Sequence, residues 1–307
     1  MAAVTSPPGA TQKSGRRHMS DGTLVRWFIL PTLILLILWN LFPLFYSLYL
    51  SFTRYEAISN QPPVWVGLAN YAAILSRKEF WAGFATTGKF ALLSVGIQTV
   101  LGFGLAMLLR AKFKGSGIIT TLILVPMMLS PVVVGVFWKL IYNPSYGIFN
   151  FLLNPANPRA AIDMLQAPNT ALWAVILVDV WMWTPFVMLL CLSGLSAIPD
   201  YLYEAAAIDR ASSWFQFRRI TLPQVAPLLL IAVLFRSIEA LKSFDLMMGL
   251  TGGGPGVTTE TVSIKLYRVA FNANDTGRSA ALAYIVLIIV ICISNVYIRT
   301  LNRIRGE

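Results

Sequence analysis

The sequence predicts an all-α, polytopic membrane protein with about six transmembrane helices. Of its 307 residues, 57% are hydrophobic and 12% are charged, and this charged fraction is about half that of an ordinary soluble domain. A helix needs about 20 apolar residues to cross the hydrocarbon core of a bilayer. Runs of that length cover residues 27–52, 88–109, 118–142, 171–195, 223–248 and 279–301. A membrane β-barrel would instead show short segments of alternating hydrophobicity.

The chain is expected to have three parts. Residues 1–22 are rich in Ser, Pro, Gly and Thr, which predicts a disordered cytoplasmic tail. Residues 23–87 hold the first transmembrane helix and a long outer loop, and residues 88–305 hold the other helices. The apolar run that begins at Trp27 is too long for a signal peptide, so we expect it to be retained.

The net charge of +11 is attributed to cytoplasmic loops and not to nucleic-acid binding. Lys and Arg are denser in the loops on the side of the N-terminus, and cytoplasmic loops of inner-membrane proteins carry this excess. We therefore expect a multi-pass protein of the bacterial inner membrane with both termini in the cytoplasm.

The composition argues against an enzyme. A membrane-embedded enzyme remains a remote alternative, but it would need metal ligands, a Ser/Lys dyad or paired carboxylates. The single histidine, His18, lies in the tail, and Cys191 and Cys292 lie in apolar runs, where cysteine is typically a small core residue. The stretch GFATTGK at residues 83–89 has the glycine and lysine spacing of a phosphate-binding loop. It is followed by Phe90, where such a loop needs Ser or Thr for magnesium, so we expect it to bind no phosphate.

A charged segment, YEAAAIDRASSWFQFRRITLPQ, separates the fourth and fifth apolar runs. Asp200 is expected to cap a helix over residues 201–208, and Ser212 or Ser213 to cap a second one. Leu222-Pro223 is expected to end that second helix, because the residue before a proline is pushed out of the α region. The segment thus predicts a helix–turn–helix at the cytoplasmic face. The alternative is an amphipathic connector that lies in the lipid headgroups.

Part of this segment resembles the EAA motif of ABC importer permeases. That motif reads EAA, three residues, Gly, nine residues and I-x-L-P, and the match runs from Glu204-Ala205-Ala206 to Ile220-Thr221-Leu222-Pro223. The motif glycine is Arg210 here. Glycine permits a left-handed turn, in which arginine would cost roughly 1 kcal/mol. Either the turn differs in this chain, or the arginine makes a compensating contact.

Two further stretches resemble the MalF-like subunits of carbohydrate permeases. They are WTPFVMLL, from Trp183, and FDLMMGLTGGGPGVTTETVSIKLYRVAF, from Phe244. The resemblance covers about residues 24–305 and implies the ABC type I importer permease fold, with a cytoplasmic EAA coupling loop at 197–223. It also implies import of a carbohydrate, whether sugar, oligosaccharide or polyol, by alternating access. A glycerol-3-phosphate or phosphodiester importer permease is the alternative, whereas a passive channel would need no ATPase-docking loop.

The resemblance implies partners as well. These are a second permease in a heterodimer, a dimer of ATP-binding subunits, an extracytoplasmic solute-binding protein and membrane lipid. ATP and magnesium would bind to the ATPase subunits, so we expect no cofactor on this chain. The implied coupling positions are Glu204, Ala205, Ala206, Ile208, Asp209 and Arg210.

Polar and aromatic side chains at membrane depth are the candidates for the substrate path, since polar groups there usually face a cavity. They are Asn40, Asp179, Trp181, Trp183, Glu239, Lys242, Phe244 and Asp245. Arg236, Glu239 and Lys242 recur every three residues, so Arg236–Glu239 and Glu239–Lys242 can pair on one helix. Ions that neutralise each other between helices are the alternative to a substrate role. Pro126, Pro131 and Pro185 are expected to break or kink their helices.

Overall fold

The computed structural model describes residues 21–111, 113–153 and 163–305. The chain divides into two compact units, Met1–Tyr49 and Leu50–Glu307. The predicted tail, with His18, lies outside the described residues except for Asp21 and Gly22, which begin the first helix.

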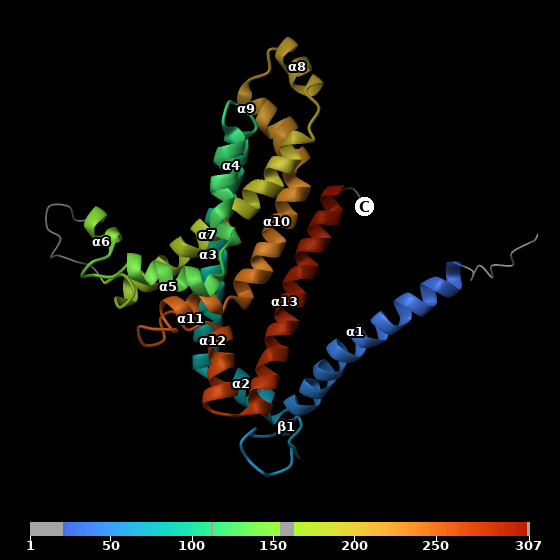
Figure 1. Ribbon diagram of the computed structural model, residues 1–307, viewed down its shortest axis with the longest axis vertical. Coiled ribbons are helices and arrows are strands. Elements are labelled where there is room, and N and C mark those ends of the chain that lie inside the picture. The colour runs from blue at the N-terminus through green and yellow to red at the C-terminus, as the bar shows by residue number, and fades with distance from the viewer. Residues whose placement is uncertain (1–20, 112, 154–162, 306–307) are drawn as a thin grey trace, which may run out of the picture. The chain divides into compact units, whose positions relative to one another are not determined.

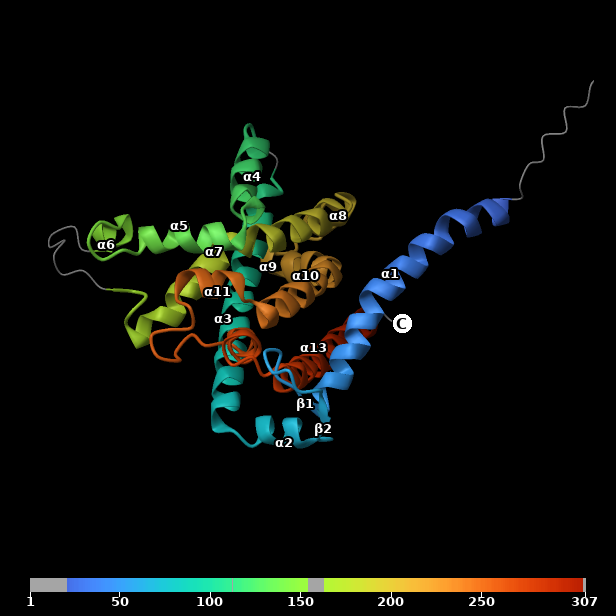
Figure 2. The ribbon, with the colours of Figure 1, turned by 60° about the horizontal axis from the view of Figure 1, so that its bottom comes forward.

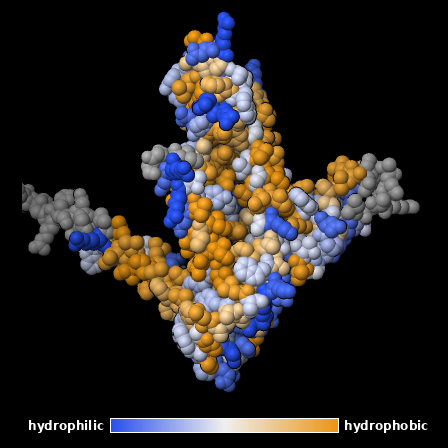
Figure 3. Space-filling view, turned by 180° about the vertical axis from the view of Figure 1, so that it is seen from behind, coloured by the Kyte–Doolittle hydropathy of each residue, from blue (hydrophilic) through white to orange (hydrophobic). Residues whose placement is uncertain are grey.

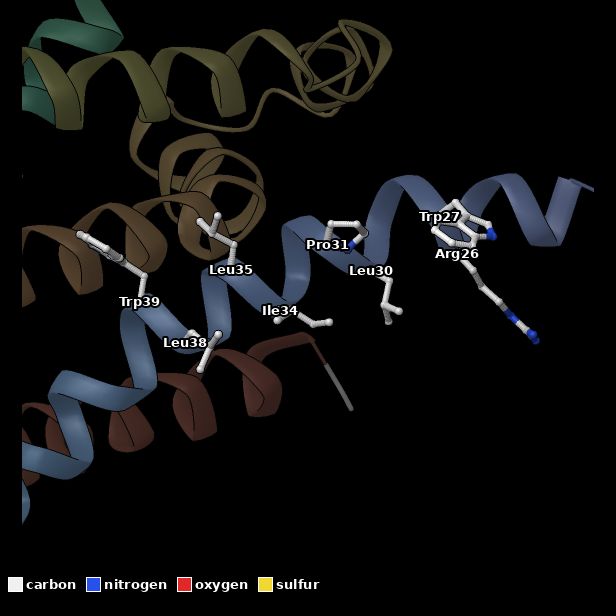
Figure 4. Close-up of a pocket in the computed structure, with 8 residues that line it drawn as sticks. All are labelled: Arg26, Trp27, Leu30, Pro31, Ile34, Leu35, Leu38 and Trp39. Atoms are coloured by element: carbon white, nitrogen blue, oxygen red, sulfur yellow. The ribbon is translucent and has the colours of Figure 1, made fainter.

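The first unit consists of most of helix α1, Asp21–Ser51. Its large apolar side chains are exposed, as for Trp27 at 72% and Trp39 at 80%. Figure 4 shows a hollow along this helix whose walls are apolar apart from Arg26. The apolar surface has the length and composition of a membrane span, and side chains in contact with lipid have no need of burial within the chain.

The second unit is built around the long helices α3 (Lys78–Leu109), α7 (Pro168–Ser196) and α10 (Leu222–Lys242), as Figure 1 shows. These three pack on one another, and α13 (Thr276–Arg305) packs on α10. The contact between α3 and α7 is close, since a Cβ atom on Gly102 would lie 2.7 Å from Val187 Cβ. A glycine is therefore needed at this crossing.

Shorter elements complete the second unit. They are β1 (Thr53–Arg54), antiparallel to β2 (Val64–Trp65), and the helices α2 (Ala69–Leu75), α4 (Ser116–Leu124), α5 (Pro131–Ile141), α6 (Ile148–Leu153), α8 (Tyr201–Ile208), α9 (Ser213–Gln216), α11 (Asp245–Leu250) and α12 (Val262–Tyr267). A 3-10 turn η1 (Val125–Met128) follows α4, and π-helical turns η2 (Phe217–Thr221) and η3 (Arg268–Asn272) follow α9 and α12.

The third predicted span is broken in the middle. Residues 118–142 were expected to form one span that Pro126 and Pro131 could break or kink, and α4 with η1 and the following α5 meet at 98° (Figure 2). Ser130 has ψ of 134°, the extended conformation that a following proline favours, and Pro131 then begins α5. Five helices of the described chain are thus long and apolar enough to span a membrane, or six if this bent pair counts as one span. Pro126 lies in η1, and α7 continues past Pro185.

The fifth predicted span is also corrected at both ends. The helix does not start at Leu222-Pro223 but runs from Ser213 through η2 and α10 to Lys242. Pro223 fits because it stands in the first turn of α10, directly after the π-helical turn. The helix ends before the predicted residue 248, since Ser243 and Phe244 leave the helical conformation and α11 begins at Asp245.

Candidate functional site

Helix α8 has the predicted bounds, Tyr201–Ile208, and its end keeps the turn that a glycine would permit. The Ala211 N–H donates to the Ala206 carbonyl at 2.9 Å, and the Arg210 N–H donates to the Ala207 carbonyl at 3.0 Å. These two bonds define a Schellman motif, which places Arg210 in the left-handed region at φ of 54°. The turn therefore does not differ, and no hydrogen bond or ion pair of the Arg210 side chain occurs among the described residues.

Replacing Arg210 with glycine is expected to stabilise the fold by about 1 kcal/mol, because glycine adopts the left-handed conformation without the clash of a Cβ atom. The measurement is the midpoint of thermal unfolding of the purified chain. An Arg219→Gly variant, which places glycine within the helical turn η2, serves as control and should lose stability by a similar amount. An Arg210→Gly midpoint below that of the unmodified chain would contradict the left-handed turn.

One of the two predicted helix caps is confirmed. The Ser212 hydroxyl accepts a hydrogen bond from the Phe215 N–H at 3.2 Å and caps α9. The other is wrong, since Asp200 is itself helical, with φ of −64° and ψ of −30°, and its side chain makes no capping bond. Its carboxylate lies 4.0 Å from the guanidinium of Arg110, at the end of α3.

The predicted coupling positions on α8 and on the turn after it differ in exposure in a way that suits a docking surface. Ala206 is buried, whereas Ile208 is 83% exposed. Glu204, Asp209 and Arg210 are exposed around Ile208, as is Ala205. An apolar anchor with charged neighbours on a short helix is the pattern that fits a groove on another protein. Figure 3 shows hydrophobic and hydrophilic surface side by side at the end of the molecule that carries α8.

Helix α8 is fixed to two of the three central helices. Tyr203 Oη shares a hydrogen bond of 2.9 Å with Thr221 Oγ1, directly before α10. The guanidinium carbon of Arg110 lies 4.2 Å from the centroid of the Tyr203 ring, which joins α8 to the end of α3. A displacement of α8 would therefore act on α3 and α10 together.

Buried polar side chains join the same helices within their candidate membrane spans. Arg236 of α10 forms a 3.1 Å ion pair with Asp179 of α7, and both side chains are less than 5% exposed. Gln98 of α3 donates to the Asp179 carboxylate at 2.7 Å and accepts from Arg236 Nε at 2.9 Å. The predicted Arg236–Glu239 pair is thus wrong, because the guanidinium points to a neighbouring helix. Gln98 was not among the predicted site residues, although a polar residue within an apolar run is a signal for such a role.

A cavity of about 140 Å³ lies beside this cluster. Six predicted substrate-path residues line it, namely Asp179, Trp183, Glu239, Lys242, Phe244 and Asp245, together with Pro131, Arg236, Ser243 and Leu246. The walls come from the start of α5, from α7, and from the junction of α10 and α11. Both interruptions of the predicted spans, at Ser130 and at Ser243, therefore border the cavity, where irregular backbone is tolerated at membrane depth.

The charges around the cavity are largely paired. Lys242 Nζ lies 3.0 Å from Glu239 Oε1, which confirms the second predicted pair. Arg236 is paired with Asp179, and its guanidinium carbon lies 4.7 Å from the centroid of the Trp183 ring. Asp245 has no ion pair or side-chain hydrogen bond within the part of the chain that the structure describes. The cavity thus offers aromatic rings, two neutralised ion pairs and one surplus carboxylate.

Of the two other predicted substrate-path residues, Asn40 belongs to the first unit and Trp181 does not line this cavity. Asn40 belongs to α1 and donates to the Leu36 carbonyl of the same helix at 2.7 Å. Trp181 lines a different hollow, between α3, α4 and α7, and its ring packs edge-on against Trp138 with centroids 5.4 Å apart. Trp181 and Trp183 therefore face different environments, although only one residue separates them on α7.

The phosphate-loop-like stretch and both cysteines lie on helices. The stretch GFATTGK lies inside α3, where its backbone N–H groups belong to a helix and form no phosphate-binding loop. Cys191 is buried and Cys292 exposed, and both are free. No group of three or more His, Cys, Asp or Glu suited to a metal ion occurs in the described ranges.

Comparison with known proteins identifies the family. The profile described as "Binding-protein-dependent transport system inner membrane component" matches residues 98–303. The trehalose/maltose transport system permease protein MalF of Thermococcus litoralis is 36% identical, covering 94% of this chain and 96% of its own. The trehalose transport system permease protein SugA of Mycobacterium tuberculosis is 31% identical, covering 94% and 91%.

A solved structure shows the same fold. It is a bacterial ABC transporter involved in the import of the acidic polysaccharide alginate, of which one chain aligns with a TM-score of 0.80 and 20% identity, covering 92% of this chain and 96% of that one. The predicted all-α permease fold and the predicted family are therefore confirmed. This chain belongs to the family of binding-protein-dependent transport system inner membrane components.

Proposed function

We propose that the chain is the transmembrane permease subunit of an ATP-driven importer for a carbohydrate. The observation that carries this proposal is the architecture of α8, whose tip exposes Ile208 among charges while Tyr203 joins its inner side to Thr221. Relatives named for transport of trehalose, maltose and starch degradation products support a carbohydrate as the cargo. The chain itself is no enzyme in this proposal.

The coupling proceeds through contacts of this chain. An ATP-binding subunit binds α8, and closure of the ATPase dimer displaces this helix. The Tyr203–Thr221 bond and the Arg110–Tyr203 contact pass the displacement to α10 and α3. Both helices contribute to the cluster of Arg236 with Asp179 and Gln98, which borders the cavity, so that the cavity opens alternately to the two sides of the membrane.

The proposal includes partners and a location. A second permease completes the transmembrane pathway, and an extracytoplasmic solute-binding protein delivers the cargo. A solved relative of low identity is described in complex with a pentasaccharide-bound periplasmic protein, which supports such a partner. ATP and magnesium bind to the ATPase subunits, and this chain holds no cofactor. The chain crosses the inner membrane several times with both termini in the cytoplasm, on the side of α8.

The cavity favours a neutral cargo over a phosphorylated one. Arg236 and Lys242, the cations that a phosphate would need, are each occupied by a carboxylate. Asp245 adds a further negative charge and would repel an anion. The same carboxylate suits sugar hydroxyls as a hydrogen-bond acceptor, and the rings of Trp183 and Phe244 suit the apolar face of a sugar. These features argue against glycerol-3-phosphate as the cargo.

Replacing Asp245 with alanine is expected to raise the KM for cargo uptake about 10-fold, which is the effect of losing one hydrogen bond to a charged group. Replacing Trp183 with alanine removes the ring that packs on the apolar face of the sugar and should raise the KM by a similar factor. Basal ATP hydrolysis should stay unchanged, because α8 and its anchors are intact. The assay is uptake into proteoliposomes that contain the complete transporter, with maltose, trehalose, a polyol and glycerol-3-phosphate as test cargoes.

Trp181→Ala is the matched control for Trp183→Ala, since Trp181 lies on the same helix but outside the cavity. Its KM should equal that of the unmodified transporter. If Trp183→Ala and Asp245→Ala leave the KM unchanged for the transported cargo, neither residue lies on the substrate path. Uptake of glycerol-3-phosphate with no uptake of the sugars would overturn the proposed cargo class.

A further inference from the structure

One face of the helix that follows the α8 turn carries exposed aromatic and cationic side chains. Trp214 is 67% exposed and Phe215 is 52% exposed. Arg218 and Arg219 are exposed as well. Residues four apart lie on the same side of a helix, so Arg218 follows Trp214 and Arg219 follows Phe215. We refer to these four residues as the aromatic–arginine face.

The aromatic–arginine face is held rigidly from behind. The Phe217 ring packs edge-on against Phe103 of α3, with centroids 5.9 Å apart. Trp214 in turn stacks on Phe217, with centroids 5.4 Å apart and an interplanar angle of 24°. The indole of Trp214 is therefore fixed at the surface by its stacking.

The positive charge of this face is not neutralised within the described chain. The segment from residue 211 to 222 contains no aspartate or glutamate. Among the described residues, neither Arg218 nor Arg219 forms an ion pair. Each guanidinium thus retains its planar set of donors, which suits bidentate binding to a phosphate.

The position of the face indicates what covers it. Residues Ser213–Lys242 form one helix that is long and apolar enough to span a membrane, and the face occupies its first two turns. The start of such a helix lies at the membrane–water boundary, where tryptophan is enriched and basic side chains attract anionic headgroups. The charge, the aromatic side chains and the position of this face therefore all favour a lipid as its ligand.

We propose that the aromatic–arginine face binds the headgroup of an anionic phospholipid. Arg218 and Arg219 hold the phosphate, and the rings of Trp214 and Phe215 rest at the boundary between headgroup and acyl chain. Phe217 packs against Trp214, and Thr221 of the same helix bonds to Tyr203 of α8. The bound lipid therefore stabilises the start of the helix to which α8 is attached. The lipid site depends neither on the identity of the cargo nor on the cavity.

The test measures lipid preference by quenching of tryptophan fluorescence. The complete transporter is placed in nanodiscs of phosphatidylcholine and phosphatidylglycerol, of which one or the other is brominated. Each protein is compared with its own Trp214→Phe counterpart, so that the difference reports the lipid beside residue 214. Replacing both arginines with glutamine should lower the preference for phosphatidylglycerol by about 30-fold, or about 5-fold for each arginine. Added salt should weaken the preference of the unmodified protein.

Two further variants keep the result specific. Replacing both arginines with lysine should retain most of the preference, since the charge remains. Replacing Arg77 and Lys78 with glutamine removes an exposed basic pair at the opposite end of α3 and should leave the preference near residue 214 unchanged.

Equal preference for the two lipids in the unmodified protein would overturn the proposal. So would a double glutamine variant that loses cargo-stimulated ATP hydrolysis but keeps its lipid preference, because the face would then bind an ATPase subunit. An equal loss in the Arg77 and Lys78 variant would show a general effect of charge and would also overturn it.

Discussion

Replacing Glu204 with lysine is expected to abolish cargo uptake and cargo-stimulated ATP hydrolysis while the chain still inserts into the membrane. Glu204 is exposed in the first turn of α8 and forms no ion pair among the described residues, so its replacement leaves the contacts of the permease intact. A reversed charge against an ATPase groove costs several kcal/mol, which reduces transport by at least about 100-fold. The measurements are uptake and ATP hydrolysis by the complete transporter in proteoliposomes.

Glu79→Lys is the matched control, because Glu79 is an exposed acid in the first turn of α3. It reverses the same charge at the other end of the bundle and should leave stimulated hydrolysis unchanged. Normal transport by the Glu204→Lys protein would contradict the role of α8. Crosslinkers at positions 204 to 210 that never capture an ATP-hydrolysing subunit would contradict it independently.

Local chemistry made α8 predictable from the sequence. A run of three alanines favours a helix, and the family spacing identifies the residue at the turn. The backbone at Arg210 then follows from the Schellman motif, which requires a left-handed residue whatever the side chain. The same reasoning found the Ser212 cap, because that hydroxyl acts within its own turn. Asp200 failed as a cap because the helical conformation already includes it.

Contacts between helices were not predictable in the same way. A spacing of three residues shows that Arg236 and Glu239 can meet on one helix, but it does not show which neighbouring helix offers a better partner. Asp179 lies far from Arg236 in sequence, and only the packing of α7 against α10 brings them together. The break at Ser243 likewise depends on backbone geometry that an apolar run does not reveal, whereas the break at Ser130 was signalled by Pro131, one of the prolines expected to break or kink a helix.

Removing one partner of the buried ion pair is expected to destabilise the protein strongly. Arg236→Met leaves the Asp179 carboxylate buried without its cation, and Asp179→Leu leaves the guanidinium without its anion. A buried charge that loses its partner costs about 3–5 kcal/mol. We expect the unfolding midpoint of either single variant to fall by about 10 °C, measured by thermal denaturation of the purified permease.

The double variant Asp179→Leu/Arg236→Met tests whether pairing itself is the cause. With both charges removed, most of the lost stability should return, because two apolar side chains can replace a buried pair at little cost. Gln98 then loses its two side-chain partners and keeps only its bond to the main-chain carbonyl of residue 179, so recovery should be completed by adding Gln98→Leu. A double variant that is as unstable as the sum of the single variants would mean that Asp179 and Arg236 act independently. Measuring uptake by the stable double variant then distinguishes an effect on stability from an effect on substrate binding. Both carboxylate oxygens of Asp179 lie within 3.2 Å of Arg236 and are therefore occupied. We thus expect the KM of the double variant to change less than that of Asp245→Ala.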